Sequence, residues 1–500
     1  MTLNEAICEI DRLEAELMAY NHAISCLYFD GETVAPRNSA ERRGETLAYL
    51  GGVVHRRMTD AKTGEALETV LAARDGLDLK TVRRAEVLKE DRDELTRVPA
   101  DEYMDYQRLL AGAGAAWHAA KPKSDYAAFA PYLEKIIEYN RRLAARKDDK
   151  KPAYDVLLDT YEKGVSMATL DPFFEQVRKA LSPVVREVGE RPRPDAPFMH
   201  EVYPVYQQRV FTDRLMAMMG LNRDDCAVGE TEHPFTDAIS GKHDVRITTH
   251  YFEENVTWSM YSVIHEGGHA LYELGVGDDL QGTVLGAGSS MGIHESQSRF
   301  YENLIGRSLP FCEALLPLLR ECFPDQVKGL DAETLYRCVN LAEPSLIRTE
   351  ADELTYPMHV MVRYELEKRM MCGELKVADI PGAWNEMYQE YLGIKVPDDR
   401  RGCLQDSHWS GGMIGYFPGY ALGSAYGAQM LRRMEADIDV WGSVRRGDLS
   451  PVTQWLGEKI HHYGRLLEPA GLIRSACGAD FDPKYYIDYL TKKYSALYAL

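Results

Sequence analysis

The chain of 500 residues is 45% hydrophobic and 27% charged, an ordinary composition for a globular protein long enough to form a large core. Its formal net charge of −20 argues against nucleic acid and anionic membrane surfaces as partners. The nine scattered cysteines include no C-x-x-C pair, which argues against a disulfide framework and a thiolate zinc site. There is no run of about 18 apolar residues and no apolar signal segment, so we expect a cytoplasmic protein without a membrane span.

Most of the chain is predicted to be helical. Residues 4–20 carry apolar side chains at spacings of three and four, and Thr2 with Glu5 has the form of a capping box. A proline-rich segment at 190–197 cannot be helix interior and is the predicted domain boundary. The two predicted regions are an N-terminal helical region and a catalytic helical region, 1–190 and 191–500.

A short segment, 244–251, departs from the helical pattern. Its β-branched residues alternate with polar ones, and this period of two predicts a strand after a turn at 240–242. We therefore expect a mainly α protein with a small sheet close to the chemical motifs. As an edge strand the segment could bind an extended peptide backbone; alternatively, it only supports the helix that follows.

The helix predicted over 256–275 carries His265-Glu266-Gly267-Gly268-His269. Histidines four residues apart lie on one helix face, where both can bind a single Zn²⁺. Glu266 lies beside the first ligand and is placed to accept a proton from water. The alternative is a buried histidine pair satisfied by hydrogen bonds. Two successive glycines inside a helix need a reason, such as close approach of another backbone or a ligand.

A catalytic zinc site keeps three protein ligands, so a third must lie downstream. The candidates are His294 and Glu295, of which only one can face the metal because neighbouring residues on a helix point about 100° apart. Glu295 would complete a His₂Glu site on a second predicted helix, 291–306. The alternative role for Glu295 is an exposed ion pair with Arg299 at i+4.

A further helix is predicted over 345–372. An apolar stripe that includes Leu354 and Met358 runs along it, Pro344 lies near its start, and Gly373 follows its end.

Six short motifs and a tyrosine-bearing segment follow one another over residues 233–420. They are HPF at 233–235, DVRIT at 244–248, HEGGH at 265–269, HESQ at 294–297, IRTEAD at 347–352, GCLQDSHW at 402–409 and GYFPGY at 415–420. In this order they resemble the M32 family of metallocarboxypeptidases, the carboxypeptidase Taq type. Residues before 190 are similar only in general character.

The resemblance implies that Glu295, not His294, is the third zinc ligand. It implies an almost wholly helical fold with two lobes around a deep substrate groove, a three-stranded sheet beside the zinc, and residues 1–190 on one side of the groove. It also implies a homodimer, peptide substrates with a free C-terminus, release of single C-terminal residues, and Co²⁺ as a substitute for Zn²⁺.

A carboxypeptidase must bind a C-terminal carboxylate, and arginine is suited to this through its bidentate fork. Arg348 is the preferred residue, and Arg246 on the predicted strand is the competing one. The alternative for Arg348 is a structural ion pair with Glu350 or Asp352.

The oxyanion of the reaction needs a donor besides the metal. Tyr420 and His408 fit this role, with Tyr416 as an alternative, and His233 and Gln405 are expected to line the substrate site. Metal-bound histidines commonly donate their second N–H to a carboxylate, for which we name Asp352.

These residues predict a zinc carboxypeptidase that acts by a promoted-water mechanism, with Glu266 as base. The alternatives are a zinc oligopeptidase or dipeptidyl carboxypeptidase, and a helical scaffold that binds metal without turnover.

Overall fold

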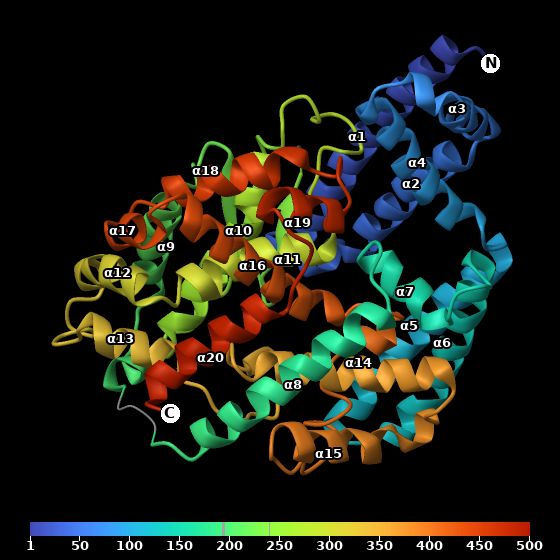
Figure 1. Cartoon of the computed structure of the whole chain (residues 1–500). Helices are drawn as coiled ribbons and strands as arrows, with labels where there is room; N and C mark the ends of the chain where they lie inside the picture. The colour runs from blue at the N-terminus through green and yellow to red at the C-terminus, as the bar shows by residue number, and fades with distance from the viewer. Residues whose placement is uncertain (193–195, 240) are drawn as a thin grey trace.

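The computed structural model describes residues 1–192, 196–239 and 241–500, and helices dominate it (Figure 1). The first helix is longer than the expected 4–20, but its capping box forms as predicted: the Thr2 hydroxyl accepts from the Glu5 amide, and the Glu5 carboxylate accepts from the Thr2 amide. The N-terminal helices, at the upper right of Figure 1, are α1 (Leu3–Thr33), α2 (Ala40–Thr59), α3 (Ala61–Ala72) and α4 (Leu79–Thr96).

The next helices lead to the proline-rich segment. They are α5 (Ala100–Ala120), α6 (Tyr126–Lys147), α7 (Ala153–Tyr161) and α8 (Met167–Gly189). Of the expected boundary at 190–197, residues 193–195 lie outside the described residues, as does Ser240 of the expected turn at 240–242. The division into 1–190 and 191–500 stays a prediction.

A small three-stranded sheet follows α9 (Val205–Met219), as the alternation at 244–251 predicts. Its strands are β1 (Cys226–Glu230), β2 (Thr236–Ala238) and β3 (Val245–Thr249), in the order β1-β3-β2. β3 pairs in parallel with β1, with Cys226 opposite Val245, and antiparallel with β2, with Thr236 opposite Ile247. β3 is therefore the middle strand, so of the two roles left open for 244–251 the edge-strand role is ruled out and the support of the following helix remains.

The two helices that carry the metal motifs follow the sheet. They are α10 (Val256–Gly275) and α11 (Met291–Arg299), which continues as a π-helical segment, η5 (Phe300–Ile305). Figure 1 shows both near the middle of the molecule, beside α16 (Pro418–Asp437). Gly275 is the last residue of α10, and a Cβ there would lie 2.6 Å from Nδ1 of His461. Close packing against His461 accounts for this glycine.

The helix predicted over 345–372 begins later than expected, at Tyr356. The residues before it form a loop with a short 3₁₀ turn, η6 (Arg348–Glu350), and Pro357 occupies the first turn of the helix. The predicted end is confirmed, since Gly373 closes the helix in a left-handed conformation with φ 78°.

The remaining helices are α12 (Leu309–Cys322), α13 (Ala332–Val339), α14 (Tyr356–Cys372), α15 (Ile380–Tyr391), α17 (Val440–Arg445), α18 (Ser450–Lys459), α19 (Pro469–Cys477) and α20 (Lys484–Tyr498), with a 3₁₀ turn η8 at His408–Gly411.

The buried apolar residues form two cores. The larger one extends from Ala113 of α5 to Tyr494 of α20 and includes residues of α10 and α11. The smaller one joins α1, α3 and α4 to the connection between α10 and α11, through residues such as Leu280 and Leu285. The helices that hold the metal motifs thus lie in one core, and the loop between them is anchored in the other.

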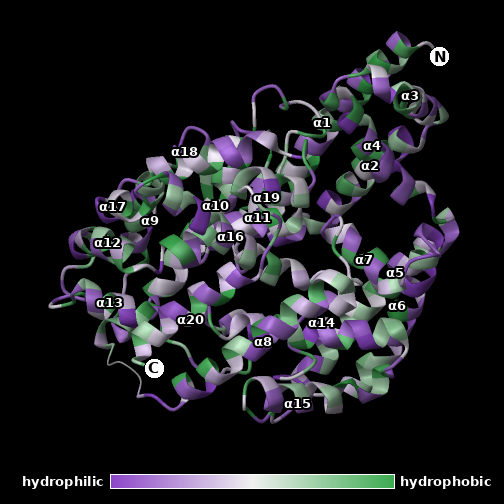
Figure 2. Ribbon diagram, viewed as in Figure 1, coloured by the Kyte–Doolittle hydropathy of each residue, from purple (hydrophilic) through white to green (hydrophobic). Residues whose placement is uncertain are grey.

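Hydrophilic and hydrophobic residues are mixed along the helices (Figure 2). Within the described ranges, no helix has the length and apolar character needed to cross a bilayer. None of the nine cysteines, all of which lie among the described residues, forms a disulfide, as their scattered positions predict.

Candidate active site

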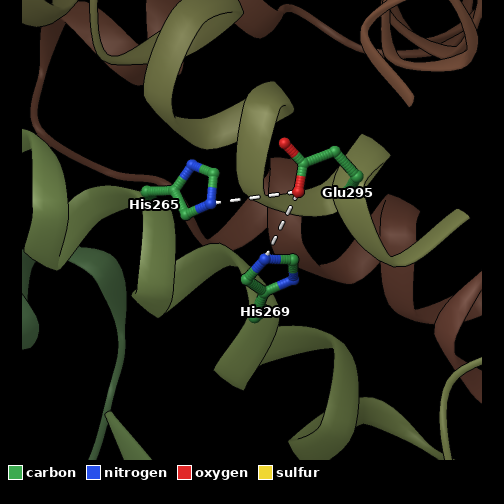
Figure 3. Close-up of side chains that lie close together, drawn as sticks. All are labelled: His265, His269 and Glu295. Carbon is green, nitrogen blue, oxygen red and sulfur yellow. Dashed lines mark ion pairs between the residues drawn. The ribbon is translucent and has the colours of Figure 1, made fainter. Parts of the chain in front are cut away.

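Two histidines of α10 and a glutamate of α11 point toward a common centre (Figure 3). One ligand atom from each of His265, His269 and Glu295 lies within 4.8 Å of the others. Oε2 of Glu295 is 4.0 Å from Nε2 of His265 and 3.7 Å from Nε2 of His269. These separations are too long for hydrogen bonds. They approach the roughly 3.3 Å between two ligands of a tetrahedral Zn²⁺ bound at about 2.0–2.1 Å, so the three groups form a candidate metal centre.

Glycines let the neighbouring helices approach the helix of Glu295. A Cβ on Gly268 of α10 would lie 2.7 Å from the carbonyl oxygen of Gln297 and 2.8 Å from Cα of Ser298. On the other side of α11, a Cβ on Gly423 of α16 would lie 2.8 Å from Cβ of Glu295. The close backbone approach expected for the glycine pair of the HEGGH motif is thus found at Gly268.

Each metal-facing histidine has a partner on its second nitrogen. Nδ1 of His265 lies 2.8 Å from Oε2 of Glu302, and Nδ1 of His269 lies 2.7 Å from Nδ1 of His294. Nε2 of His294 lies 2.6 Å from Oε1 of Glu273. If Nε2 of each histidine faces a metal, its Nδ1 must carry the hydrogen and donate it. His294 then accepts on Nδ1 and donates from Nε2, which determines the tautomer of every ring.

The prediction that Asp352 is the carboxylate partner of a metal-facing histidine was wrong. Its carboxylate accepts hydrogen bonds from the backbone amides of Glu343, Leu354 and Thr355 instead. Asp352 therefore shapes the turn before α14. Burial raises its pKa to about 6, against these hydrogen bonds.

Glu295 takes part in both interactions that the sequence left as alternatives. While Oε2 faces the two histidines, Oε1 accepts a hydrogen bond of 2.7 Å from Nε of Arg299. The pair is buried rather than exposed, because Glu295 is only 6% accessible. Arg299 also lies 3.4 Å from Glu302, the partner of His265. One guanidinium thus braces both carboxylates of the centre.

Glu266 lies on α10 beside the candidate metal centre and binds the sheet. Its Oε2 accepts a 2.6 Å hydrogen bond from the hydroxyl of Thr236 in strand β2. The same hydroxyl lies 3.0 Å from the carbonyl oxygen of Glu266, so β2 determines the rotamer of this side chain. Burial raises the pKa of Glu266, although His265 and Thr236 oppose the shift. A carboxylate with a raised pKa is suited to exchange protons near neutral pH.

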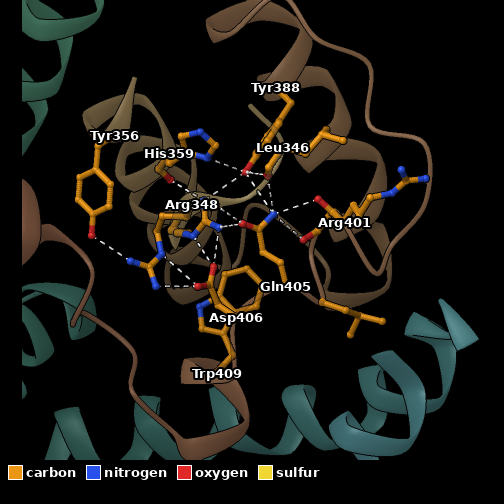
Figure 4. A network of polar contacts seen from close by, with 12 residues as sticks. Leu346, Arg348, Tyr356, His359, Tyr388, Arg401, Gln405, Asp406 and Trp409 are labelled. Atoms are coloured by element: carbon orange, nitrogen blue, oxygen red, sulfur yellow. Dashed lines mark hydrogen bonds and ion pairs between the residues drawn. The ribbon is translucent and has the colours of Figure 1, made fainter. Parts of the chain in front are cut away.

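Arg348 is buried, with 5% of its surface exposed, and its guanidinium is fixed on two sides (Figure 4). Nε and Nη2 lie 3.0 and 2.8 Å from Oδ1 of Asp406, and Nη1 donates to the hydroxyl of Tyr356 at 2.9 Å. The expected alternative partners, Glu350 and Asp352, form no ion pair with it within the described residues. A guanidinium has five N–H groups. One N–H on each of Nη1 and Nη2 therefore has no partner in the described part of the chain.

Asp406 joins Arg348 to a second buried arginine, Arg363 of α14, which sequence reasoning missed. Nε of Arg363 donates to Oδ2 of Asp406 at 2.7 Å. Burial alone would raise the pKa of Asp406, but Arg363 and Arg348 hold it well below its ordinary range. Gln405 is buried too: its Oε1 accepts from the amide of Arg348 and from Nη2 of Arg363, and its Nε2 donates to Leu346. Both ends of the Gln405 amide therefore bind protein groups (Figure 4).

A single aromatic ring connects the arginine to the metal centre. The guanidinium of Arg299, which binds Glu295, lies 4.5 Å from the ring centroid of Tyr356. The hydroxyl of the same tyrosine binds Arg348. Arg299 and Tyr356 thus connect Arg348 to Glu295, and of these two Tyr356 was not predicted.

The predicted oxyanion groups also gather near Arg348. Its guanidinium lies 5.2 Å from the ring of Tyr420, and the rings of Tyr416 and Tyr420 are 5.5 Å apart. His408 lies 5.4 Å from Tyr416 and 6.3 Å from Tyr420, measured between ring centroids. Burial raises the pKa of Tyr420 well above its ordinary value. Burial lowers the pKa of His408 to about 4, against the effect of Asp406, so this imidazole is neutral at pH 7.

His233 and Arg246 lie apart from this group. His233 is exposed in the connection between β1 and β2. Both Nε and Nη2 of Arg246 bind the carboxylate of Asp244 at 2.7 Å, and its guanidinium lies 5.2 Å from the ring of Phe29 in α1. Arg246 also lines a separate cavity of about 560 Å³ between α1, α9 and the sheet. The arginine that lies among the other candidate residues is Arg348.

Comparisons with known proteins agree with this geometry. The family model described as carboxypeptidase Taq (M32) metallopeptidase matches residues 9–494. Carboxypeptidase 1 of Bacillus subtilis is 39% identical over 483 residues, 96% of each chain, and thermostable carboxypeptidase 1 of Thermus thermophilus is 37% identical over 484 residues, 94% of each chain. The crystal structure of an M32 carboxypeptidase from Deinococcus radiodurans superposes with a TM-score of 0.96 at 35% identity, covering 99% of this chain and 100% of that one.

Proposed function

The chain belongs to the carboxypeptidase Taq (M32) family of metallopeptidases, and from this premise we propose that it is a zinc-dependent carboxypeptidase that releases single residues from peptides. The observation that carries the proposal is the pair of sites linked by Tyr356. One is a His₂Glu centre, and the other is a buried arginine, Arg348, with two N–H groups that have no partner in the described residues. A metallocarboxypeptidase needs its metal and its carboxylate receptor at a fixed separation.

The donor set fits zinc. Two imidazole nitrogens and one carboxylate oxygen are the ligands of many catalytic zinc sites, which keep a fourth position for substrate. In this chain His265, His269 and Glu295 would hold the ion. Nδ1 of His265 binds Glu302, Nδ1 of His269 binds His294, and Oε1 of Glu295 binds Arg299. The Nε2 atoms of the two histidines and Oε2 of Glu295 therefore remain for the ion. Bound Zn²⁺ supplies Lewis-acid chemistry, because it polarises a carbonyl and lowers the pKa of water. Cobalt, which accepts similar ligands, is the expected substitute.

Glu266 is the proposed base and acid of the reaction. Its carboxylate, held by Thr236, takes a proton from the attacking water and then delivers that proton to the leaving amine. The raised pKa of Glu266 favours the first transfer, because a carboxylate with a higher pKa is the stronger base, and the group then holds the proton until the amine leaves.

The oxyanion that forms at the scissile carbonyl is stabilised by the hydroxyl of Tyr420 and by the neutral imidazole of His408, with Tyr416 packed against both. The raised pKa of Tyr420 keeps its hydroxyl protonated, so that it can donate. Donors of this kind, fixed in place before the reaction, typically contribute roughly 3–4 kcal/mol to transition-state stabilisation.

Arg348 is the proposed receptor of the C-terminal carboxylate. Asp406 binds Nε and Nη2 of the guanidinium, and the N–H groups that remain on Nη1 and Nη2 are the proposed donors to the carboxylate. Gln405, expected as a lining residue, instead positions Arg348 from behind in this proposal. His233, in the exposed connection before β2, remains a proposed contact for residues further along the peptide, whereas Arg246 is left with a structural role beside Asp244.

We further propose that residues 1–190 form one side of the substrate groove and that the protein works in the cytoplasm as a homodimer. The lack of disulfides among the nine cysteines and the absence of a membrane-spanning helix within the described ranges are compatible with that compartment. Dimerisation rests on the family resemblance and is tested by light scattering on the purified protein.

The function is tested by digesting a peptide with a free C-terminus in the presence of Zn²⁺ and weighing the products by mass spectrometry. A ladder that shortens by one residue at a time, and that a chelator abolishes, is the expected result. Steps of two residues would identify a dipeptidyl carboxypeptidase, and internal fragments would identify an oligopeptidase. No cleavage at all would support the alternative of a helical scaffold that binds metal without turnover.

A further inference from the structure

Glu367 of α14 is a buried carboxylate that no step of the proposed reaction uses. Its side chain has no exposed surface, and within the described residues it forms no ion pair with a lysine or arginine. Burial raises its pKa to about 7, against the lowering effect of the groups that bind it. A buried acid without a salt-bridge partner is costly and needs hydrogen bonds to be tolerated.

Three donors from two separate segments converge on this carboxylate. The indole Nε1 of Trp409 donates to Oε1 at 2.8 Å, and the amide of Gly415 donates to Oε2 at 2.8 Å. The hydroxyl of Tyr154 in α7 also donates to Oε2, at 2.9 Å. Glu367 therefore holds the two ends of the loop 409–415 and attaches both to α7.

The backbone of this loop also fits α7 closely at Gly415. Its φ is 92°, in the left-handed region, and a Cβ there would lie 3.1 Å from the backbone carbon of Leu157. The position thus accepts only glycine on two grounds. The hydrogen bond from Gly415 to Glu367 is accordingly made by a backbone with little freedom to move.

The residues just outside the two held positions belong to the proposed oxyanion group. His408 precedes Trp409, Tyr416 follows Gly415, and their rings lie 5.4 Å apart. Tyr416 in turn lies 5.5 Å from Tyr420. The carboxylate of Glu367 therefore sets the distance between the two ends of the loop. It thereby also sets the distance between the rings of His408 and Tyr416, which lie at either end of the loop beside Tyr420.

We propose that Glu367 is a positioning residue for the reaction, which holds His408 and Tyr416 in the arrangement at which they face Tyr420. It does not touch the substrate and acts only through the loop. The inference rests on the proposed function, since it assigns importance to the groups that stabilise the oxyanion.

The test is Glu367→Gln in the zinc-loaded full-length protein. The amide replaces one acceptor oxygen by an NH₂ group, which cannot accept from Trp409 or Gly415, so one donor loses its partner. We expect kcat to fall about 10–100-fold, with KM within about threefold of the parent and the same zinc content per chain. The matched control is Glu9→Gln in α1. Glu9 is also a buried carboxylate, it is bound by Arg57 and Lys62, and it lies in a different part of the chain from Glu367 and the loop 409–415. The control should lower the melting temperature and leave kcat unchanged.

A second variant separates positioning from general destabilisation. Trp409→Phe removes the indole N–H, so the NH₂ group of Glu367→Gln can occupy the Oε1 position without facing a donor, while Oε2 still binds Tyr154 and Gly415. The double variant should therefore exceed Glu367→Gln in kcat by at least about threefold. If the fold-losses in kcat of the two single variants simply multiply in the double variant, the inference is overturned.

The remaining outcomes are also decisive. A Glu367→Gln enzyme with parental kcat refutes the positioning role, even if its melting temperature falls. If that variant does not fold, Trp409→Phe alone decides: a kcat about 3–10-fold below the parent supports the inference, and a parental kcat overturns it. A parent that cleaves no free-acid peptide refutes the proposed function instead, so the two failures are distinguishable.

Discussion

Substituting Gly268 by alanine tests whether the approach of α10 to α11 builds the metal centre. The new Cβ would lie 2.7 Å from the carbonyl oxygen of Gln297, while ordinary contacts begin at 3.4 Å, so the helices must separate by about 0.7 Å. The opposing atoms are backbone atoms two and three residues beyond Glu295, so the ligand moves with them. Metal–ligand distances tolerate only about ±0.2 Å. We expect a loss of about 2–3 kcal/mol in the free energy of unfolding and at least tenfold weaker zinc binding.

The neighbouring glycine provides a matched control. A Cβ on Gly267 would meet Cε of Met219 at 2.7 Å, the far end of a flexible side chain that can turn away. Gly267→Ala should therefore keep parental zinc affinity, and the gain in helix propensity, about 1 kcal/mol, should offset much of the crowding. Stability is measured by urea unfolding and zinc affinity by competition with a chromogenic chelator. Equal zinc affinities for the two alanine variants would refute the reasoning.

Three further predictions concern the reaction and its metal. Glu266→Gln should lower kcat by about a thousandfold or more and retain zinc; residual activity within tenfold of the parent, measured on a free-acid peptide, would remove Glu266 as base. His408→Gln should lower kcat/KM by one constant factor between pH 5.5 and 8, because the pKa of His408, about 4, keeps it neutral throughout; a factor that changes with a midpoint near pH 6.5 would contradict this. Zinc at 100 times its Kd should stabilise the parent by about 2.7 kcal/mol in thermal unfolding, and His265→Ala should lose this gain; equal responses would show that the ion binds elsewhere.

The two histidines of the candidate metal centre could be predicted because their geometry is local. A spacing of four residues places His265 and His269 on one face of a helix, and the helical pattern around them predicts that helix. Glu295 could not be assigned from spacing alone. Spacing left His294 as an alternative third ligand, and it left an ion pair with Arg299 as an alternative role for Glu295. In the structure all three groups take part: Glu295 faces the centre, Arg299 binds its other oxygen, and His294 supports His269.

The partners of buried polar groups could not be predicted in the same way. Arg348 pairs with Asp406, 58 residues later, and His265 with Glu302, 37 residues later. No periodicity connects such positions, because tertiary packing decides which carboxylate reaches which donor. The nearby acid Asp352 appeared suitable for either role, yet its oxygens are taken up by backbone amides of its own turn.

The start of α14 and the sheet order show a second limit. An apolar stripe marks which residues face a core, but Pro357 allows the helix to begin only at Tyr356, and the preceding residues form the turn that presents Arg348. The alternation of residue types over 244–251 likewise predicted β3, but it did not predict the two strands that pair with it. Whether a strand is central or at an edge depends on the other strands, and β1 and β2 lack a clear alternation of apolar and polar residues.

The central claim is that Arg348 selects the C-terminal carboxylate at the metal. It is tested by measuring kcat/KM of the parent and of Arg348→Ala on one peptide with either a free or an amidated C-terminus. Asp406 keeps Arg363 as partner in the variant, so the fold should persist. We expect the parent to prefer the free acid at least about a hundredfold, equivalent to roughly 3 kcal/mol, and the variant to lose this preference. A variant that still prefers the free acid by the parental factor would contradict the claim.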